Sequence, residues 1–325
     1  MTDPVLEVEA LDVTLFTRAG ALPAVQAFSI AVGAGETVAL VGESGCGKSL
    51  TALAIMRLLP DPPARQTGGA IRLAGKNLSD LPERDMVRLR GRDVAMIFQD
   101  PMSALNPVLP IGAQLAEVLR AHTDLRSRAV QDRAIELLQL VGVPDAARRL
   151  ADYPHQLSGG TCQRVMIAMA VACRPRLLIA DEPTTALDVT IQAQVLALLS
   201  DLKREVGMGM LYITHDLAVV AEIAERVVVM YAGVKVEQAS TEALFATPLH
   251  PYTRGLLAAT PAPGGPLRAA LTEIPGRVPP LSERPTGCLF AARCPLVFDR
   301  CRAERPALHA AGAGHQVACF AVPPP

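Results

Sequence analysis

The stretch that decides the fold is Gly42-Glu43-Ser44-Gly45-Cys46-Gly47-Lys48-Ser49. It lies between an apolar run, residues 37–41, which predicts a buried strand, and residues 50–59, which predict a helix. Glycines in such a turn let backbone N–H groups converge on phosphate oxygens at the helix N-terminus. Lys48 can then neutralise the β- and γ-phosphates, and Ser49 can offer a hydroxyl group to Mg²⁺. The stretch therefore predicts a triphosphate site, in which the variable position Cys46 holds a small filler residue.

Two carboxylates follow a second apolar run, Leu177-Leu178-Ile179-Ala180. This pattern predicts a buried strand that presents Asp181 and Glu182 at its carboxyl end, the edge at which parallel α/β sheets bind ligands. Asp181 can help to hold Mg²⁺ through water, and Glu182 can orient or polarise an attacking water molecule. Two acids after a strand are more often a solvated turn, but a phosphate loop in the same chain favours a catalytic pair.

A second anion-binding helix N-terminus is predicted at Leu157-Ser158-Gly159-Gly160, which precedes Gln163-Arg164 and the helical run 163–172. This segment resembles the signature motif of ABC-type ATPases. The other motifs of that family follow in order: Gln99 after the strand 94–98, the turn Ala186-Leu187-Asp188 after Glu182, and His215 after the apolar run 211–214. The resemblance covers residues 5 to about 240 and implies an α/β fold with a parallel core sheet.

The resemblance also implies a mechanism. Two such domains pack head to tail, so that Ser158, Gly159 and Gly160 of one chain cover the ATP held by its partner. Gln99 would contact Mg²⁺ and the attacking water, His215 would contact the γ-phosphate, and Asp188 would link the two sites across the interface. The implied reaction is hydrolysis of ATP by attack of water on the γ-phosphate.

Three positions depart from the family pattern or leave a choice open. Thr161 stands where glutamine is common, and Cys162 stands where a basic residue is common. The aromatic residue that stacks on adenine should lie in the first strand, where Phe16 is our prediction and Leu15 is the alternative. Phe16 could equally be a core residue.

The remaining sequence predicts three further regions. Short β-rich runs at residues 6–16, 28–32 and 70–73 indicate an antiparallel subdomain. Residues 105–170 are predicted to form a helical subdomain, and residues 190–206 are predicted to form an amphipathic helix. Of the 27 prolines, 14 fall within residues 248–325, so long helices and central strands should be rare there. We therefore expect a nucleotide-binding domain over residues 1–245 and a loop-rich C-terminal extension over residues 246–325.

Several stretches resemble one branch of the family, the oligopeptide and dipeptide importers. They are FQDPMSALNP at residues 98–107, residues 163–168, IADEPTTALDVTIQAQ at residues 179–194, and His-Pro-Tyr-Thr at residues 250–253. We interpret the last motif as a proline-fixed turn that docks the extension. The branch implies two transmembrane permeases, which dock in a groove after Gln99, an extracytoplasmic substrate-binding protein and a second, different ATPase subunit. Import of nickel, glutathione or another small solute by the same architecture is the alternative.

Four cysteines gather in the extension: Cys288, Cys294, Cys301 and Cys319. Four thiolates in a loop-rich segment suit Zn²⁺ or an iron–sulfur cluster, because neither requires regular secondary structure. The spacing contains no C-x-x-C pair, which weakens a zinc-ribbon interpretation, and members of the branch with such cysteines are associated with a [4Fe-4S] cluster. Four unliganded thiols are the alternative.

Composition excludes several other classes of protein. With 31 Lys and Arg against 32 Asp and Glu in 325 residues, no broad basic field exists for nucleic acid. No apolar run approaches the roughly 20 residues that span a bilayer, and Met-Thr-Asp-Pro does not resemble a secretory signal, so we expect a peripheral protein at the cytoplasmic face of the membrane. A non-transport ABC protein should show a coiled-coil insertion or tandem cassettes, which are not evident. Intact Lys48, Glu182 and His215 argue against a degenerate structural partner.

Overall fold

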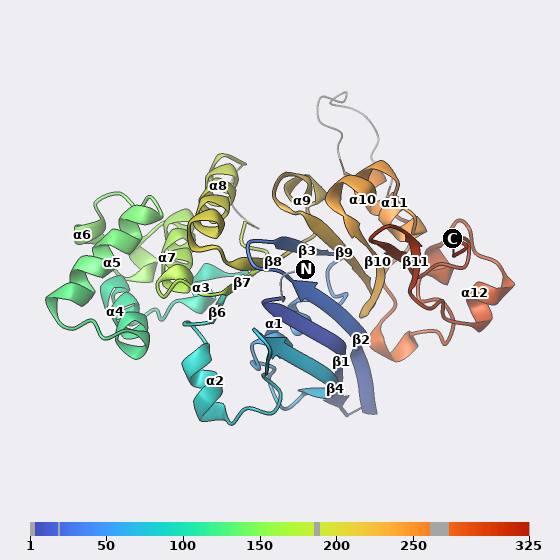
Figure 1. Cartoon of the computed structure of the whole chain (residues 1–325), viewed down its shortest axis with the longest axis horizontal. Helices are drawn as coiled ribbons and strands as arrows, with labels where there is room; N and C mark the ends of the chain where they lie inside the picture. Colours follow the sequence, from blue (N-terminus) through green and yellow to red (C-terminus); the bar gives the residue numbers. More distant parts are fainter. Residues whose placement is uncertain (1–3, 19, 185–188, 261–272, 325) are drawn as a thin grey trace. The chain divides into compact units, whose positions relative to one another are not determined.

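The computed structural model describes residues 4–18, 20–184, 189–260 and 273–324 (Figure 1). These residues form two compact units. The first comprises residues 4–5, 33–36 and 80–211, and the second comprises residues 6–32, 37–79 and 212–325 within the described ranges. The predicted turn Ala186-Leu187-Asp188 lies outside the described residues.

An antiparallel sheet in the second unit confirms the predicted β-subdomain. Its strand order is β2 (Gly20–Val32), β1 (Leu6–Thr17), β4 (Ala64–Leu73) and β5 (Lys76–Asn77). The three long strands lie side by side in Figure 1. Bulges shift the register of β1 against both neighbours, which increases the local twist of the strand.

The phosphate loop joins elements of the same unit. It connects β3 (Thr37–Val41), whose residues are all buried, to α1 (Lys48–Ile55). The helix is shorter than the predicted run to residue 59, because Arg57 adopts a left-handed φ of 51° that a helix cannot continue through.

A second sheet of this unit joins β3 to the C-terminal extension. β3 is parallel to β9 (Arg226–Tyr231), and β10 (Val234–Ser240) is antiparallel to β9. β10 also pairs with β12 (His315–Val317), which pairs with β11 (His309–Gly312). The remaining helices of this unit are α9 (Leu217–Ile223), α10 (Thr241–Ala246), α11 (Pro251–Ala258), η2 (Leu281–Glu283), η3 (Ala291–Arg293) and α12 (Asp299–Ala303). The extension thus contributes strands to the sheet that carries the phosphate loop.

The first unit contains the predicted helical subdomain. Its parallel strands β6 (Val94–Ile97) and β7 (Leu177–Asp181) pair directly. Its helices are α2 (Glu83–Leu89), α3 (Pro101–Ala104), α4 (Ile111–His122), α5 (Arg128–Leu140), α6 (Ala146–Arg149), η1 (Pro154–Gln156), α7 (Gly159–Val171) and α8 (Val189–Val206). The boundary between the units falls inside β8 (Gly209–Thr214). Of the described helices, none has the length and apolarity needed to cross a membrane.

Lys235 on β10 makes the stability of the fold depend on pH. Burial and the nearby Arg226 lower the pKa of Lys235 from 10.5 to about 8. The unfolded chain keeps this proton up to the higher value, so between the two values it binds more protons than the folded chain, and the free energy of unfolding rises with pH. Below about pH 8 the amine is charged in both states, and the folded state bears the full desolvation cost.

We therefore expect Lys235→Met to raise the free energy of unfolding by about 1 kcal/mol at pH 7 and to change it little near pH 10.5. The measurement is the shift in thermal unfolding midpoint at the two pH values. Lys76→Met, which removes an exposed lysine of β5, serves as the control. An equal gain from Lys235→Met at both values would contradict the assignment.

Candidate functional site

The phosphate loop is fixed where β3 ends. A Cβ atom at Gly42 would lie 2.2 Å from the carbonyl oxygen of Met230 and 2.8 Å from Cys46 Sγ, so only glycine fits. Gly47 caps α1 with a left-handed φ of 108°. Cys46 accepts a backbone hydrogen bond from Gly233 on its carbonyl oxygen, at 2.7 Å, which ties the loop to the β9–β10 turn.

Lys48 lies over the loop that precedes it. Its ammonium group donates to the carbonyl oxygens of Gly42, at 2.7 Å, and Glu43, at 3.1 Å. Cys46 is fully buried and burial raises the pKa of its thiol, which agrees with its predicted role as a packing residue. Ser44, Gly45 and Ser49 are exposed. The loop therefore exposes backbone groups and two serine side chains, while the ammonium group of Lys48 is bonded to carbonyl oxygens of the loop.

Glu182 and Gln99 meet in the first unit. The Gln99 side-chain amide donates to Glu182 Oε2 at 3.1 Å, although the residues are 83 positions apart. Glu182 adopts a left-handed φ of 47°, a strained conformation for a residue with a side chain. Asp181 is only 4% exposed at the end of β7. The structure thus brings together two of the predicted catalytic residues at the edge of a parallel strand pair.

Ser158 caps the signature helix. Its Oγ accepts from the Thr161 amide at 3.3 Å and lies 2.8 Å from the Thr161 hydroxyl. A Cβ atom at Gly159 would have open space around it, so this N-terminus of α7 remains accessible. Gln163, one turn into α7, donates to the carbonyl oxygen of Pro183 at 2.6 Å. The signature helix is thereby attached to the residue that follows Glu182.

Three other residues from the sequence analysis, His215, Phe16 and Leu15, are described here one by one. His215 is exposed immediately after β8, and Asp216 caps α9. Phe16 is 47% exposed with the Arg65 guanidinium 5.7 Å from its ring centroid, so its assignment to the core is wrong. Leu15 is half-buried. Stacking of Phe16 on adenine stays a prediction.

The four cysteines of the extension surround one small enclosed cavity, which His250 and Phe290 also line. Burial raises the pKa of the thiols of Cys288, Cys294 and Cys319. Among the described residues, no group of three or more His, Cys, Asp or Glu side chains is disposed to hold a metal ion. The four cysteines thus line one space, but they form no metal site among the described residues.

The His-Pro-Tyr-Thr motif is the first turn of α11. His250 caps the helix by accepting from the Tyr252 amide at 3.0 Å on Nδ1, and Pro251 occupies the first helical position. Burial lowers the pKa of His250 to about 3, so the ring is neutral. Tyr252 docks the extension as predicted, but its partner is unexpected: the hydroxyl oxygen accepts from the Glu43 amide of the phosphate loop at 2.8 Å.

A second unexpected contact joins the same loop residue to the extension. Arg293 forms two hydrogen bonds with the Glu43 carboxylate, at 2.6 and 2.9 Å. The carboxylate raises the pKa of the Arg293 guanidinium. Sequence reasoning missed both partners of Glu43, because the only signal was an acid in the loop, with no indication of its counter-ion.

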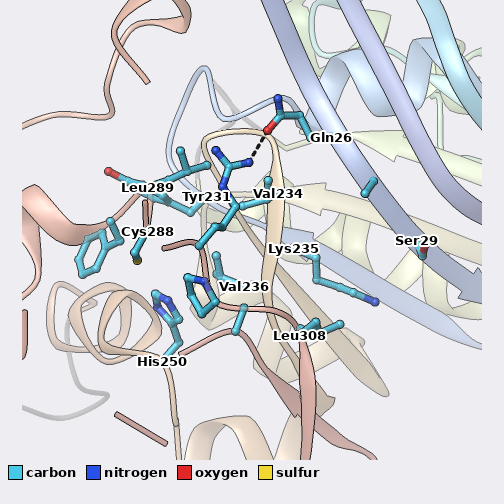
Figure 2. Close-up of a pocket in the computed structure, with 15 residues that line it drawn as sticks. Gln26, Ser29, Tyr231, Val234, Lys235, Val236, His250, Cys288, Leu289 and Leu308 are labelled. Atoms are coloured by element: carbon cyan, nitrogen blue, oxygen red, sulfur yellow. Dashed lines mark hydrogen bonds between the residues drawn. The ribbon is translucent and has the colours of Figure 1, made fainter. Parts of the chain in front are cut away.

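A cavity of about 280 Å³ lies where the extension packs against β2 and β10 (Figure 2). Its lining includes Gln26, Ser29, Tyr231, Lys235, Cys288 and Arg305. Two of the lining residues are bonded to each other, since Arg305 donates to Gln26 Oε1. The lining comes from β2, β9, β10 and the extension rather than from the phosphate loop.

Comparisons with known proteins agree with the site. The ABC transporter family matches residues 25–185, and the family described as oligopeptide/dipeptide transporter, C-terminal region, matches residues 236–301. The ATP-binding cassette MJ0796, solved as a dimer in a post-hydrolysis state bound to ADP and phosphate, is 26% identical with a TM-score of 0.66 over 73% of this chain and 98% of that chain. Fold and site thus define an ABC-type ATPase, an enzyme that hydrolyses ATP.

Two relatives specify the branch. The oligopeptide transport ATP-binding protein AppD of Bacillus subtilis is 50% identical over 97% of this chain and 96% of its own length. The dipeptide transport ATP-binding protein DppD of Escherichia coli is 49% identical over 97% of this chain and 95% of its own length. The chain therefore belongs to the ATP-binding subunits of ABC transporters, in the oligopeptide/dipeptide group.

Proposed function

We propose that this protein hydrolyses ATP to drive import of dipeptides or oligopeptides through partner permeases. The observation that carries the proposal is the C-terminal region at residues 236–301, which matches that of oligopeptide/dipeptide transporters, in a chain half identical to peptide-transport subunits. A peripheral position on the cytoplasmic face of the membrane follows from this role.

The residues can be assigned to steps of the hydrolysis. Lys48 and the loop amides bind the phosphates, and His215 contacts the γ-phosphate. Ser49 and Gln99 would offer hydroxyl and amide oxygens to Mg²⁺, and Asp181 would help to hold it through water, since oxygen donors are those that Mg²⁺ prefers. When bound, the ion would supply positive charge beside the phosphates. Glu182 orients the attacking water and accepts its proton, and the hydrogen bond from Gln99 Nε2 supports this role by fixing the carboxylate.

A second ATPase subunit completes the proposed assembly. Ser158, Gly159 and Gly160 cover the ATP of that partner, and a different subunit is the favoured partner. The role proposed for Asp188, which is outside the described residues, is to link the two sites across the interface. For the permeases, we propose the segment after Gln99 as the docking groove. Three apolar side chains near it support this proposal by their exposure: Phe98 at 36%, Met102 at 45% and Val108 at 74%.

The experiment is uptake by proteoliposomes that contain this subunit, its co-purified permeases and second ATPase, and the substrate-binding protein. Labelled dipeptide should accumulate only with ATP, and Glu182→Gln in this subunit should reduce the uptake. Nickel and glutathione are tested in parallel to separate the cargoes. Failure of the tagged protein to co-purify any permease would favour a non-transport ABC ATPase.

We also propose that the four cysteines of the extension hold a [4Fe-4S] cluster. One observation supports a shared metal site: the four side chains line one enclosed cavity. Zn²⁺, the alternative, needs sulfurs about 2.3 Å from one centre. Among the described residues no group of three or more His, Cys, Asp or Glu side chains is disposed to hold a metal ion, and this finding favours neither metal group. The cluster would supply cross-linking of a segment with little core of its own.

Anaerobically purified protein is therefore expected to be brown and to contain iron and sulfide in equal amounts. Cys301→Ser, which removes a buried donor, should lose the colour and most of the iron. Cys173→Ser, which changes a cysteine of the first unit, should keep both. A colourless protein loaded with zinc would reject the cluster, and a metal-free protein of full stability would reject any metal.

A further inference from the structure

Glu43, the second residue of the phosphate loop, is held by side chains of the extension at two of its polar groups. Arg293 Nη1 and Nη2 donate to carboxylate oxygens Oε2 and Oε1 at 2.6 and 2.9 Å. The Glu43 amide donates to Tyr252 Oη at 2.8 Å. Both partners lie more than 200 residues further along the chain, in the same compact unit.

The Arg293 side chain is buried and is held by hydrogen bonds in addition to those with Glu43. Its side chain is 4% exposed, and all five of its N–H donors have acceptors. Besides the two carboxylate oxygens, these acceptors are the carbonyl oxygens of Pro275 and Ile274 and, at 3.5 Å, the Tyr231 hydroxyl. Only a planar guanidinium satisfies all of them at once, so lysine cannot replace it.

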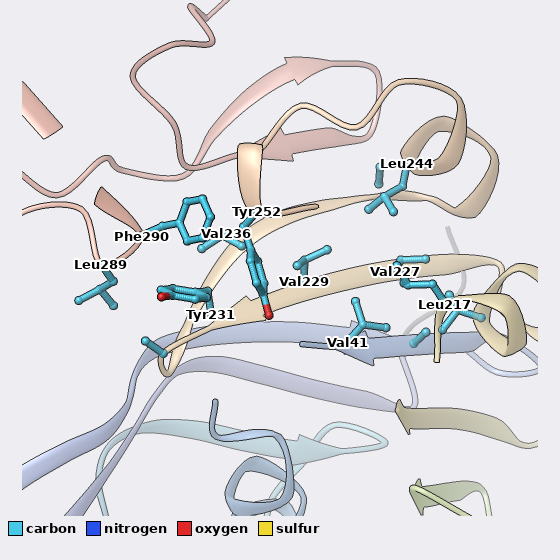
Figure 3. Packing of buried hydrophobic residues seen from close by; sticks show 14 residues of the cluster. Val41, Leu217, Val227, Val229, Tyr231, Val236, Leu244, Tyr252, Leu289 and Phe290 are labelled. Carbon is cyan, nitrogen blue, oxygen red and sulfur yellow. The ribbon is translucent and has the colours of Figure 1, made fainter. Parts of the chain in front are cut away.

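Tyr252 is equally constrained. Its ring packs against Tyr231 and Phe290, with ring centroids 4.7 and 5.4 Å apart, inside a buried aromatic cluster. Figure 3 shows these three rings gathered over β9 and β10. Tyr252 is fully buried, so its hydroxyl group has one fixed position, in reach of the loop.

The contacts continue to the phosphate-binding lysine. The carbonyl oxygen of Glu43 accepts from Lys48 Nζ at 3.1 Å and from the Cys46 amide at 3.3 Å. The amide, carboxylate and carbonyl groups of Glu43 are thus all engaged. Any displacement of Arg293 or Tyr252 moves the residue that also positions the loop cation.

We propose that Arg293 and Tyr252 are positioning residues of the ATP site, through which the extension sets the conformation of the phosphate loop. This inference rests on the proposed assignment of that loop to ATP. The extension is then part of the nucleotide-binding machinery. Arg293 lies between Cys288 and Cys294 in the sequence, so the segment that carries the cysteines also carries this contact with the phosphate loop.

The test measures binding of a fluorescent ATP analogue and the kinetics of hydrolysis with the full-length protein. Arg293→Met is expected to raise both the Kd and the KM for ATP about tenfold, because the loop loses its preorganised conformation. The kcat at saturating ATP should stay within about twofold, because Glu43 does not touch the reacting atoms. A merely structural role would lower kcat by reducing the active fraction and leave KM unchanged.

Two further comparisons separate the possible outcomes. Glu43→Gln combined with Arg293→Met should bind ATP no more weakly than Arg293→Met alone, since both remove one contact. Arg300→Met removes an exposed arginine of the extension that pairs with Glu304 and lies over the Phe320 ring but makes no contact with Glu43, and it should bind ATP like the wild type. If Arg293→Met does not fold, Tyr252→Phe, which deletes one oxygen atom, should raise the KM in the same direction.

Different ATP affinities would overturn the proposal and the assignment of the ATP site. Normal ATP affinity in Arg293→Met and Tyr252→Phe, with lost binding in Lys48→Met, overturns the proposal and leaves the ATP site in place. Normal affinity in Lys48→Met as well overturns the site assignment and the proposal with it.

Discussion

Glu182→Gln should bind ATP as the wild type does and hydrolyse it at least about 100-fold more slowly, the usual loss when a general base is removed. The substitution keeps the shape of the side chain and one oxygen that can accept from Gln99, so the first unit should be unchanged. It removes the negative charge that attracts the proton of the attacking water. Steady-state phosphate release and equilibrium binding of an ATP analogue measure the two properties separately.

The control is Glu205→Gln, which removes an exposed carboxylate that pairs with Arg174 at 3.6 Å on the surface. Such pairs contribute little, so hydrolysis should be unchanged. Hydrolysis by Glu182→Gln at the wild-type rate would overturn the assignment of Glu182 and direct attention to another base.

Lys48→Met should weaken ATP binding by about 100-fold. The amine can form two charge-assisted hydrogen bonds to phosphate oxygens, each contributing about 1.5–3 kcal/mol. Methionine retains the length of the side chain but cannot donate. The same substitution removes the bonds from Nζ to the carbonyl oxygens of Gly42 and Glu43, which loosens the loop. Isothermal titration with a non-hydrolysable ATP analogue gives the change in Kd.

Cys46→Ser is the matched control in the same loop. The thiol is fully buried, burial raises its pKa, and its sulfur makes one long contact of 3.9 Å with Lys48 Nζ. Its side chain is therefore predicted to fill space, while its backbone belongs to the phosphate loop. Affinity within about threefold of the wild type is expected, since serine is nearly isosteric. Equal loss in both variants would mean that any disturbance of the loop abolishes binding and that the charge of Lys48 is not the cause.

Local motifs were enough to predict the elements on which the chemistry depends. A glycine-rich turn between an apolar run and a helix has few conformations available to it. For this reason, residues 42–49 were correctly predicted to join a buried strand to a helix. Ser158 was placed at a helix N-terminus for the same reason, and it caps α7. Patterns with a range of a few residues also predicted the antiparallel sheet and the helical subdomain. The end of α1 was predicted too late, because nothing in the sequence marks the left-handed turn at Arg57.

The sequence by itself determined the class of enzyme, since each motif places the groups of its predicted site on a few neighbouring residues. Only the tertiary structure decided which distant residues meet. The bond from Gln99 to Glu182 and the convergence of four cysteines on one cavity are examples. The contact of Arg293 with Glu43, which are 250 residues apart, is another. Such contacts depend on how strands and helices pack, and packing is a property of the whole fold that no short-range pattern encodes.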